Sequence, residues 1–145
     1  MYRKILVAYN GTSESRSALY ECVRLAPSPS AEIHLLAVVH ISSYLMGEEY
    51  VPEDAFAVEE QKMKQELTEG HALMTAAGLN VIEHLEVGEP VNVIGKLAEE
   101  LGIELVIVGH PRHQSWAMRW WRGSTDALLV EKVRCSLLVA ADAKH

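Results

Sequence analysis

The sequence is poor in cysteine, in basic side chains and in long apolar runs, and each shortage argues against a class of protein. Its 145 residues include two cysteines, Cys22 and Cys135, too few and too far apart for a disulfide framework. The formal net charge of −7 argues against general nucleic-acid binding, because most of the surface would repel phosphate. No apolar run approaches the roughly 20 residues that span a bilayer, and no signal peptide is visible. We therefore expect a cytoplasmic protein that binds neither nucleic acid nor membrane.

Familiar catalytic signatures are missing as well. The chain has no Gly-x-x-x-x-Gly-Lys loop, no dinucleotide fingerprint after its first strand and no Gly-x-Ser-x-Gly turn. His110 and His113 are three residues apart, but neither a thiolate nor a pair of carboxylates accompanies them. We therefore expect no catalytic residues and no metal site.

What the chain has instead is a regular alternation of strand and helix patterns in a composition typical of a globular domain, 49% hydrophobic and 23% charged. The length suits a single domain over residues 1–145. In residues 79–87 apolar and polar positions alternate, which is typical of a strand at a sheet edge. The five strand patterns cover residues 4–9, 32–40, 79–87, 104–108 and 136–141.

Helical periodicity fills the intervals between these strands. The helices are expected to begin at Ser13, near Pro52 or Ala55, at Pro90 and at Ser124, the last with Ala127, Val130 and Val133 facing inward. Strands that alternate with helices predict an α/β fold, an open five-stranded parallel sheet with helices on both faces. In such a sheet ligands bind beyond the carboxyl ends of the strands.

One cationic segment stands out in this acidic chain. Between Gly109 and Gly123 it carries Arg112, Arg119 and Arg122, all three tryptophans and no carboxylate. It joins a strand to the small residues that begin the last helix, and a helix N-terminus with nearby arginines attracts phosphate. The segment therefore predicts a phosphate site, most simply for a nucleotide. Two other interpretations stay open, namely turn and cap chemistry, and a Trp/Arg surface that docks a protein partner.

Three stretches resemble the universal stress protein family, and together they cover essentially the whole chain. They are KILVAYNGTSESRSAL, VGEPVNVIGKLAEELGIELVIVGH and RGSTDALLVEKVRCSLLVA. The resemblance implies a Rossmann-like fold of the adenine nucleotide alpha hydrolase type and a regulatory, stress-response role. Its nucleotide signature is Gly, two residues, Gly, nine residues, then Gly-Ser or Gly-Thr. By this resemblance the nucleotide-binding positions are Ala8, Asn10 and Val38 for the adenine, and Gly109, Gly123, Ser124 and Thr125 for the phosphates.

The chain departs from that signature at two places. Arg112 occupies the position of the second glycine, and the distance from Gly109 to Gly123 is one residue longer than in the family pattern. Asn10 stands where the family usually has aspartate. Arg112 removes a close backbone approach to phosphate but supplies a cation that can bind one.

The functional expectation is therefore a regulatory protein that binds ATP or AMP, with Mg²⁺ only if the nucleotide carries it. Hydrolysis would be slow and incidental, because no positioned general base is apparent. The alternative is a nucleotide-free stress-response module that docks an unknown protein partner through its Trp/Arg segment.

The last strand predicts how two copies assemble. Residues 136–141, from Ser136 to Ala141, are apolar on both faces, and a bare apolar edge strand is an aggregation hazard. Pairing with the same strand of a second copy would cover it, so we expect a homodimer.

Overall fold

The protein is a five-stranded parallel sheet with helices on both faces. The computed structural model describes residues 2–10, 13–25, 28–39, 54–109 and 129–141. All four strand pairings are parallel, in the order β3-β2-β1-β4-β5, so the predicted fold class is confirmed. The strands are β1 (Lys4–Ala8), β2 (Glu32–Val39), β3 (Asn80–Val87), β4 (Leu105–Gly109) and β5 (Ser136–Ala140). The helices are α1 (Ser13–Arg24), α3 (Ala55–Ala76), α4 (Pro90–Leu101) and α5 (Leu129–Lys132).

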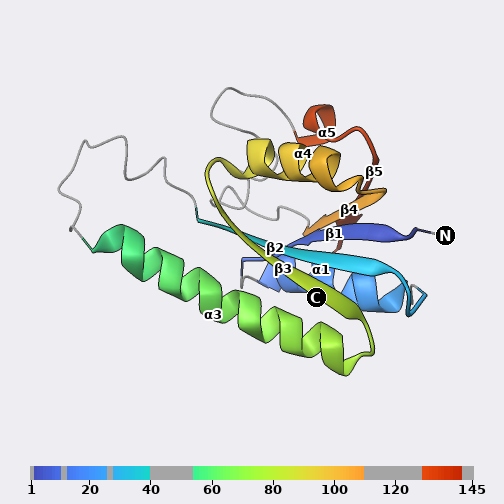
Figure 1. The fold of residues 1–145 in the computed structure, drawn as a ribbon, viewed down its shortest axis with the longest axis horizontal. Helices are drawn as coiled ribbons and strands as arrows, with labels where there is room; N and C mark the ends of the chain where they lie inside the picture. The colour runs from blue at the N-terminus through green and yellow to red at the C-terminus, as the bar shows by residue number, and fades with distance from the viewer. Residues whose placement is uncertain (1, 11–12, 26–27, 40–53, 110–128, 142–145) are drawn as a thin grey trace.

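The helices lie in two layers, with α1 and α3 on one face of the sheet and α4 and α5 on the other (Figure 1). Each layer closes over its own core, and β1 contributes to both by alternation. Ile5 and Val7 join the core under α1 and α3, whereas Leu6 and Ala8 join the core under α4 and α5. Because the central strands are buried on both faces, their sequences are mostly apolar, with His34 of β2 as a buried polar exception.

The two edge strands were both anticipated. β3 and β5 end the sheet on opposite sides, and β3 is only partly buried along its length. The polar positions of β3 therefore lie where one side of the strand meets solvent.

A proline and a glycine mark the two ends of α4. Pro90 occupies the first turn, where its missing N–H costs nothing, and Gly102 caps the other end with φ 69° in the left-handed region. None of the helices in the described ranges is long and apolar enough to cross a membrane.

One helix phase was wrong. Val130 was expected to face inward, but it is 57% exposed, whereas Leu129 is fully buried and Val133 is buried. Leu129 and Val133 are four residues apart and share one stripe, which turns Val130 about 100° away from the core. The predicted start of this helix at Ser124 lies outside the described residues.

Candidate functional site

The order of the strands creates a crossover point between β1 and β4. From β1 the chain proceeds to β2 and β3 on one side, and from β4 it proceeds to β5 on the other. The described helices that follow β1 and β4, namely α1 and α5, lie on opposite faces of the sheet, so the chain diverges there. Such a divergence leaves a crevice in which open α/β sheets bind their ligands.

Three of the predicted binding positions meet at the carboxyl-terminal edge of the sheet, where β1 and β4 end. Ala8 is paired with Leu36, which places Val38 two residues further along the neighbouring strand. Gly109 ends β4 two residues beyond Ile107, the partner of Val7. The side chains of Ala8 and Val38 are 3% and 4% exposed and belong to the core under α4 and α5. What these positions bring to the edge is therefore mainly the peptide backbone.

Asn10, the fourth predicted position in the described part of the chain, is held by Ser15 at the start of α1. The Asn10 N–H donates to Ser15 Oγ over 3.1 Å, and the Ser15 hydroxyl donates to Asn10 Oδ1 over 2.7 Å. Both residues are buried, at 6% exposure each. Because both partners of each bond are shielded from water, the orientation of Asn10 is fixed before any ligand arrives.

Tyr9 and Arg16 add a polar contact that the sequence did not reveal. Tyr9 is 1% exposed, and its backbone N–H donates to Leu36 O over 2.8 Å. Burial raises the pKa of the Tyr9 phenol, while a side-chain hydrogen bond with the exposed Arg16 guanidinium opposes that rise. The same bond raises the pKa of Arg16. The partner of Arg16 becomes apparent only when the end of β1 is placed beside the first turns of α1.

The phosphate half of the predicted site cannot be placed in the same way. Arg112, Gly123, Ser124 and Thr125 lie in residues 110–128, outside the described residues. So do the other arginines and the tryptophans of that segment. The structure therefore brings together Ala8, Asn10, Val38 and Gly109, and it leaves the remaining four positions as predictions.

Other features of the described ranges lie away from this edge. A surface cavity of about 200 Å³ opens between the end of α4 and the approach to β5, and it is lined by residues that include Ala98, Glu99, Lys132 and Cys135. It sits at the amino ends of β4 and β5, opposite Ala8 and Gly109, and so is separate from the candidate site. Among the residues described, no three His, Cys, Asp or Glu side chains gather as metal ligands would.

Comparison with known proteins gives one consistent match. The family model described as the universal stress protein family matches residues 1–141. A Staphylococcus haemolyticus protein that carries a universal stress protein name is 30% identical over 141 residues, covering 95% of this chain and 84% of that protein.

Two solved structures show the same fold at lower identity. A universal stress protein in complex with cAMP is 22% identical, with a TM-score of 0.68 and 98% coverage of both chains. A family protein from Arabidopsis thaliana with AMP bound is 15% identical, with a TM-score of 0.67, covering 97% of this chain and 92% of that one.

Proposed function

The chain belongs to the universal stress protein family, and we propose that it is a single-domain regulatory protein that binds ATP or AMP at the carboxyl end of its sheet. The crossover between β1 and β4 carries this proposal, because the backbones of Ala8, Val38 and Gly109 end at one edge there. The cAMP and AMP complexes of the two structural neighbours support an adenine nucleotide as the ligand.

The proposed roles follow from the positions of the residues. The backbone near Ala8 and Val38, with the Asn10 amide, would line the adenine. Gly109, Gly123, Ser124 and Thr125 would surround the phosphates with N–H groups and a hydroxyl, and Arg112 would supply the countercharge. Mg²⁺ would enter only with the nucleotide.

Thermal stability and tryptophan fluorescence test this proposal together. A ligand at 100 times its Kd stabilises the folded state by about 2.7 kcal/mol, which raises the Tm by several degrees. All three tryptophans, Trp116, Trp120 and Trp121, lie in the proposed phosphate segment, so ATP or AMP should also change the emission. Calorimetric titration would give the Kd, with GTP as the comparison for the base.

Two arginine variants separate a specific phosphate contact from general charge. Arg112→Gln should weaken ATP more than AMP, because ATP has more phosphate for this side chain to bind. Arg134→Gln removes the same charge from an exposed position just before β5, at the other end of the sheet, and should leave the Kd unchanged. Equal losses in both variants would mean that the net charge of the protein, and not a site, attracts the nucleotide.

A nucleotide-free interaction module is the second candidate, and Arg112 in place of the family's second glycine is the observation that favours it. In this case Arg112 and the longer segment close the phosphate site, and the Trp/Arg surface docks a protein partner. The absence of any thermal shift with millimolar ATP, ADP and AMP would support this second candidate and contradict the first.

We also propose that the protein is a cytoplasmic homodimer that pairs through residues 136–141, and that any hydrolysis of ATP is slow and incidental. The position of β5 at an edge of the sheet, with three partly buried apolar residues in a row, supports the pairing. Incubation with labelled ATP would test the second point, because steady turnover would identify an enzyme.

A further inference from the structure

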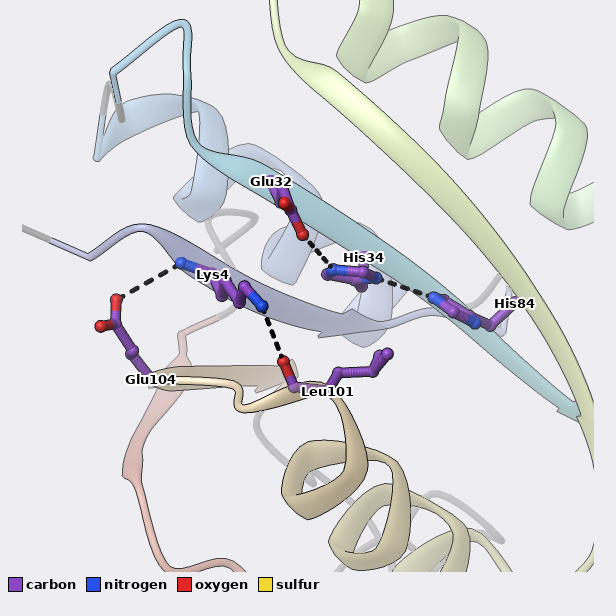
Figure 2. A network of polar contacts seen from close by, with 6 residues as sticks. All are labelled: Lys4, Glu32, His34, His84, Leu101 and Glu104. Carbon is purple, nitrogen blue, oxygen red and sulfur yellow. Dashed lines mark hydrogen bonds and ion pairs between the residues drawn. The ribbon is translucent and has the colours of Figure 1, made fainter.

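Two histidines from neighbouring strands contact each other on the face of the sheet that α4 covers. His34 on β2 and His84 on β3 place Nδ1 and Nε2 2.8 Å apart, with ring centroids separated by 5.0 Å (Figure 2). His34 is 4% exposed and His84 is half-buried. Neither residue belongs to the nucleotide site proposed above, so this pair needs its own explanation.

Glu32 determines which nitrogen of His34 carries a hydrogen. Its Oε1 lies 3.2 Å from His34 Nε2, on the side of the ring that faces away from His84 (Figure 2). An ionised carboxylate only accepts, so Nε2 must be the donor. In the neutral pair His34 Nδ1 is therefore the acceptor, and His84 Nε2 donates to it.

This arrangement accepts one proton but not two. A first proton can be taken up at Nδ1 of His84, and the Nε2–H to Nδ1 bond between the rings survives. A second proton would have to occupy His34 Nδ1, which would point an N–H at another N–H across 2.8 Å. Two imidazolium rings at this distance also repel each other, so the contact must open. Burial and the neighbouring His34 both lower the pKa of His84, and Glu86 opposes them.

The charged side chains near this face have partners of their own or face solvent, so they do not hold β3 to β2 in place of the histidine pair. On the same face Lys4 of β1 donates from Nζ to the Leu101 carbonyl of α4 over 3.2 Å (Figure 2). The charged side chains of α4 itself, Lys96, Glu99 and Glu100, are exposed to solvent.

The opposite face of β3 carries a separate contact to α3. There the α3 residue His71 places Nδ1 2.5 Å from Glu83 Oε2. This contact lies on the other side of the strand from the His34–His84 pair, so the two can be altered independently.

We propose that the His34–His84 pair is a proton-sensitive latch that holds the edge strand β3 against β2 and releases it when both imidazoles are protonated. β3 has a hydrogen-bonded neighbour on one side only, so the latch acts on a strand with little other support. Eight paired residues continue to join the two strands, and the expected response is a local opening of β3 rather than its detachment. This inference does not depend on nucleotide binding.

Histidine NMR titration of the unaltered protein, with amide hydrogen exchange along β3, tests the latch. From about pH 8 to about pH 5 the two imidazoles should titrate as a coupled pair in two steps, the second below the ordinary histidine value. After correction for the intrinsic dependence of exchange on pH, protection of the β3 amides should fall about tenfold over this range.

Two glutamine variants identify the group responsible. His84→Gln keeps an N–H donor for His34 Nδ1 but cannot gain a proton, so the fall in protection should shrink to about twofold or less. His71→Gln removes a titrating ring from the other face and should retain the full fall. Independent titration of both rings at ordinary values would overturn the latch. So would a His84→Gln protein that loses protection in acid as the unaltered protein does.

Discussion

Ser15 and Asn10 bond to each other in both directions, with the Ser15 hydroxyl accepting from the Asn10 N–H and donating to Asn10 Oδ1. The pair joins the carboxyl end of β1 to the first turn of α1, at the crossover edge. One hydroxyl thus fixes both the backbone and the side chain of the residue proposed to meet the adenine. The asparagine is held by the fold itself and does not wait for a ligand.

Ser15→Ala should destabilise the protein and weaken nucleotide binding together. The change removes the hydroxyl that bonds to a buried N–H and to a buried amide oxygen, and the free energy of unfolding should fall by about 2 kcal/mol. Urea denaturation measures this loss, and calorimetry measures the Kd for AMP. Thr68→Ala is the control, because its exposed hydroxyl bonds only within α3, to Lys64 O. A stable Ser15→Ala protein with unchanged affinity would show that Asn10 needs no such support.

Gly70 lets α3 approach the end of β1 closely. A Cβ built at this position would lie 3.1 Å from Leu35 Cδ2 and 3.2 Å from Tyr9 Cδ2, and both of those side chains are fully buried. Gly70→Leu should therefore lower the free energy of unfolding by about 3 kcal/mol, despite the better helix propensity of leucine. Ala72→Leu, at an exposed position of the same helix, should change it by less than about 0.5 kcal/mol. Urea denaturation of the two proteins would compare them, and equal stabilities would contradict the close packing.

Most of the fold was accessible from the sequence because its strands and helices have different periods. The apolar runs gave all five strands to within about a residue at each end, and the alternation in residues 79–87 gave β3 its place at an edge. Val130 was misplaced because it follows another apolar residue, Leu129, so residue type alone does not say which of the two shares the inward stripe with Val133.

The polar contacts could not be predicted from the sequence, since they depend on the register between neighbouring strands and helices. His34 and His84 are 50 residues apart, and no spacing in the sequence links one to the other. They meet only because Leu36 pairs with His84, which puts His34 one step away on the same face. Tyr9 and Arg16 escaped notice for the same reason. Residue type predicts that a polar group needs a partner, but the partner is set by the packing of elements.

Gly102 should be costly to replace although nothing crowds it. Its φ of 69° is left-handed, and a Cβ there would meet no atom within 4 Å, so the cost is that of the backbone conformation alone. Gly102→Ala should lower the free energy of unfolding by about 1 kcal/mol, and Gly102→Asn by less, since asparagine tolerates this region. Thermal or urea denaturation would rank the three proteins. An alanine variant as stable as the unaltered protein would mean that the helix can end in another way.

The two thiols should differ sharply in reactivity. Burial raises the pKa of Cys22 to about 12, so the thiolate fraction at pH 8 is about one in ten thousand. Burial raises the pKa of Cys135 as well, but this residue is only half-buried and its reagent access is better. Iodoacetamide followed by mass spectrometry should therefore label Cys135 slowly and Cys22 only after unfolding in guanidinium. Rapid labelling of Cys22 in the folded protein would contradict its place in the core.

Two proline variants in β5 separate loss of the proposed homodimer from loss of the fold. The Ser136 N–H donates to the carbonyl oxygen of Glu104, the residue just before β4. Backbone N–H groups point to alternate sides along a strand, so the Leu138 N–H also points to β4, whereas the Val139 N–H points to the open edge. Val139→Pro should remove an outward donor and part of a side chain that packs against the core under α4 and α5, and it should give a folded monomer of 16.1 kDa by sedimentation or light scattering. Leu138→Pro breaks the β4–β5 ladder and should destabilise the fold itself by about 3 kcal/mol or more. If the unaltered protein runs as a monomer, or if Val139→Pro remains dimeric and folded, pairing through β5 is wrong and some other surface must cover its apolar side chains.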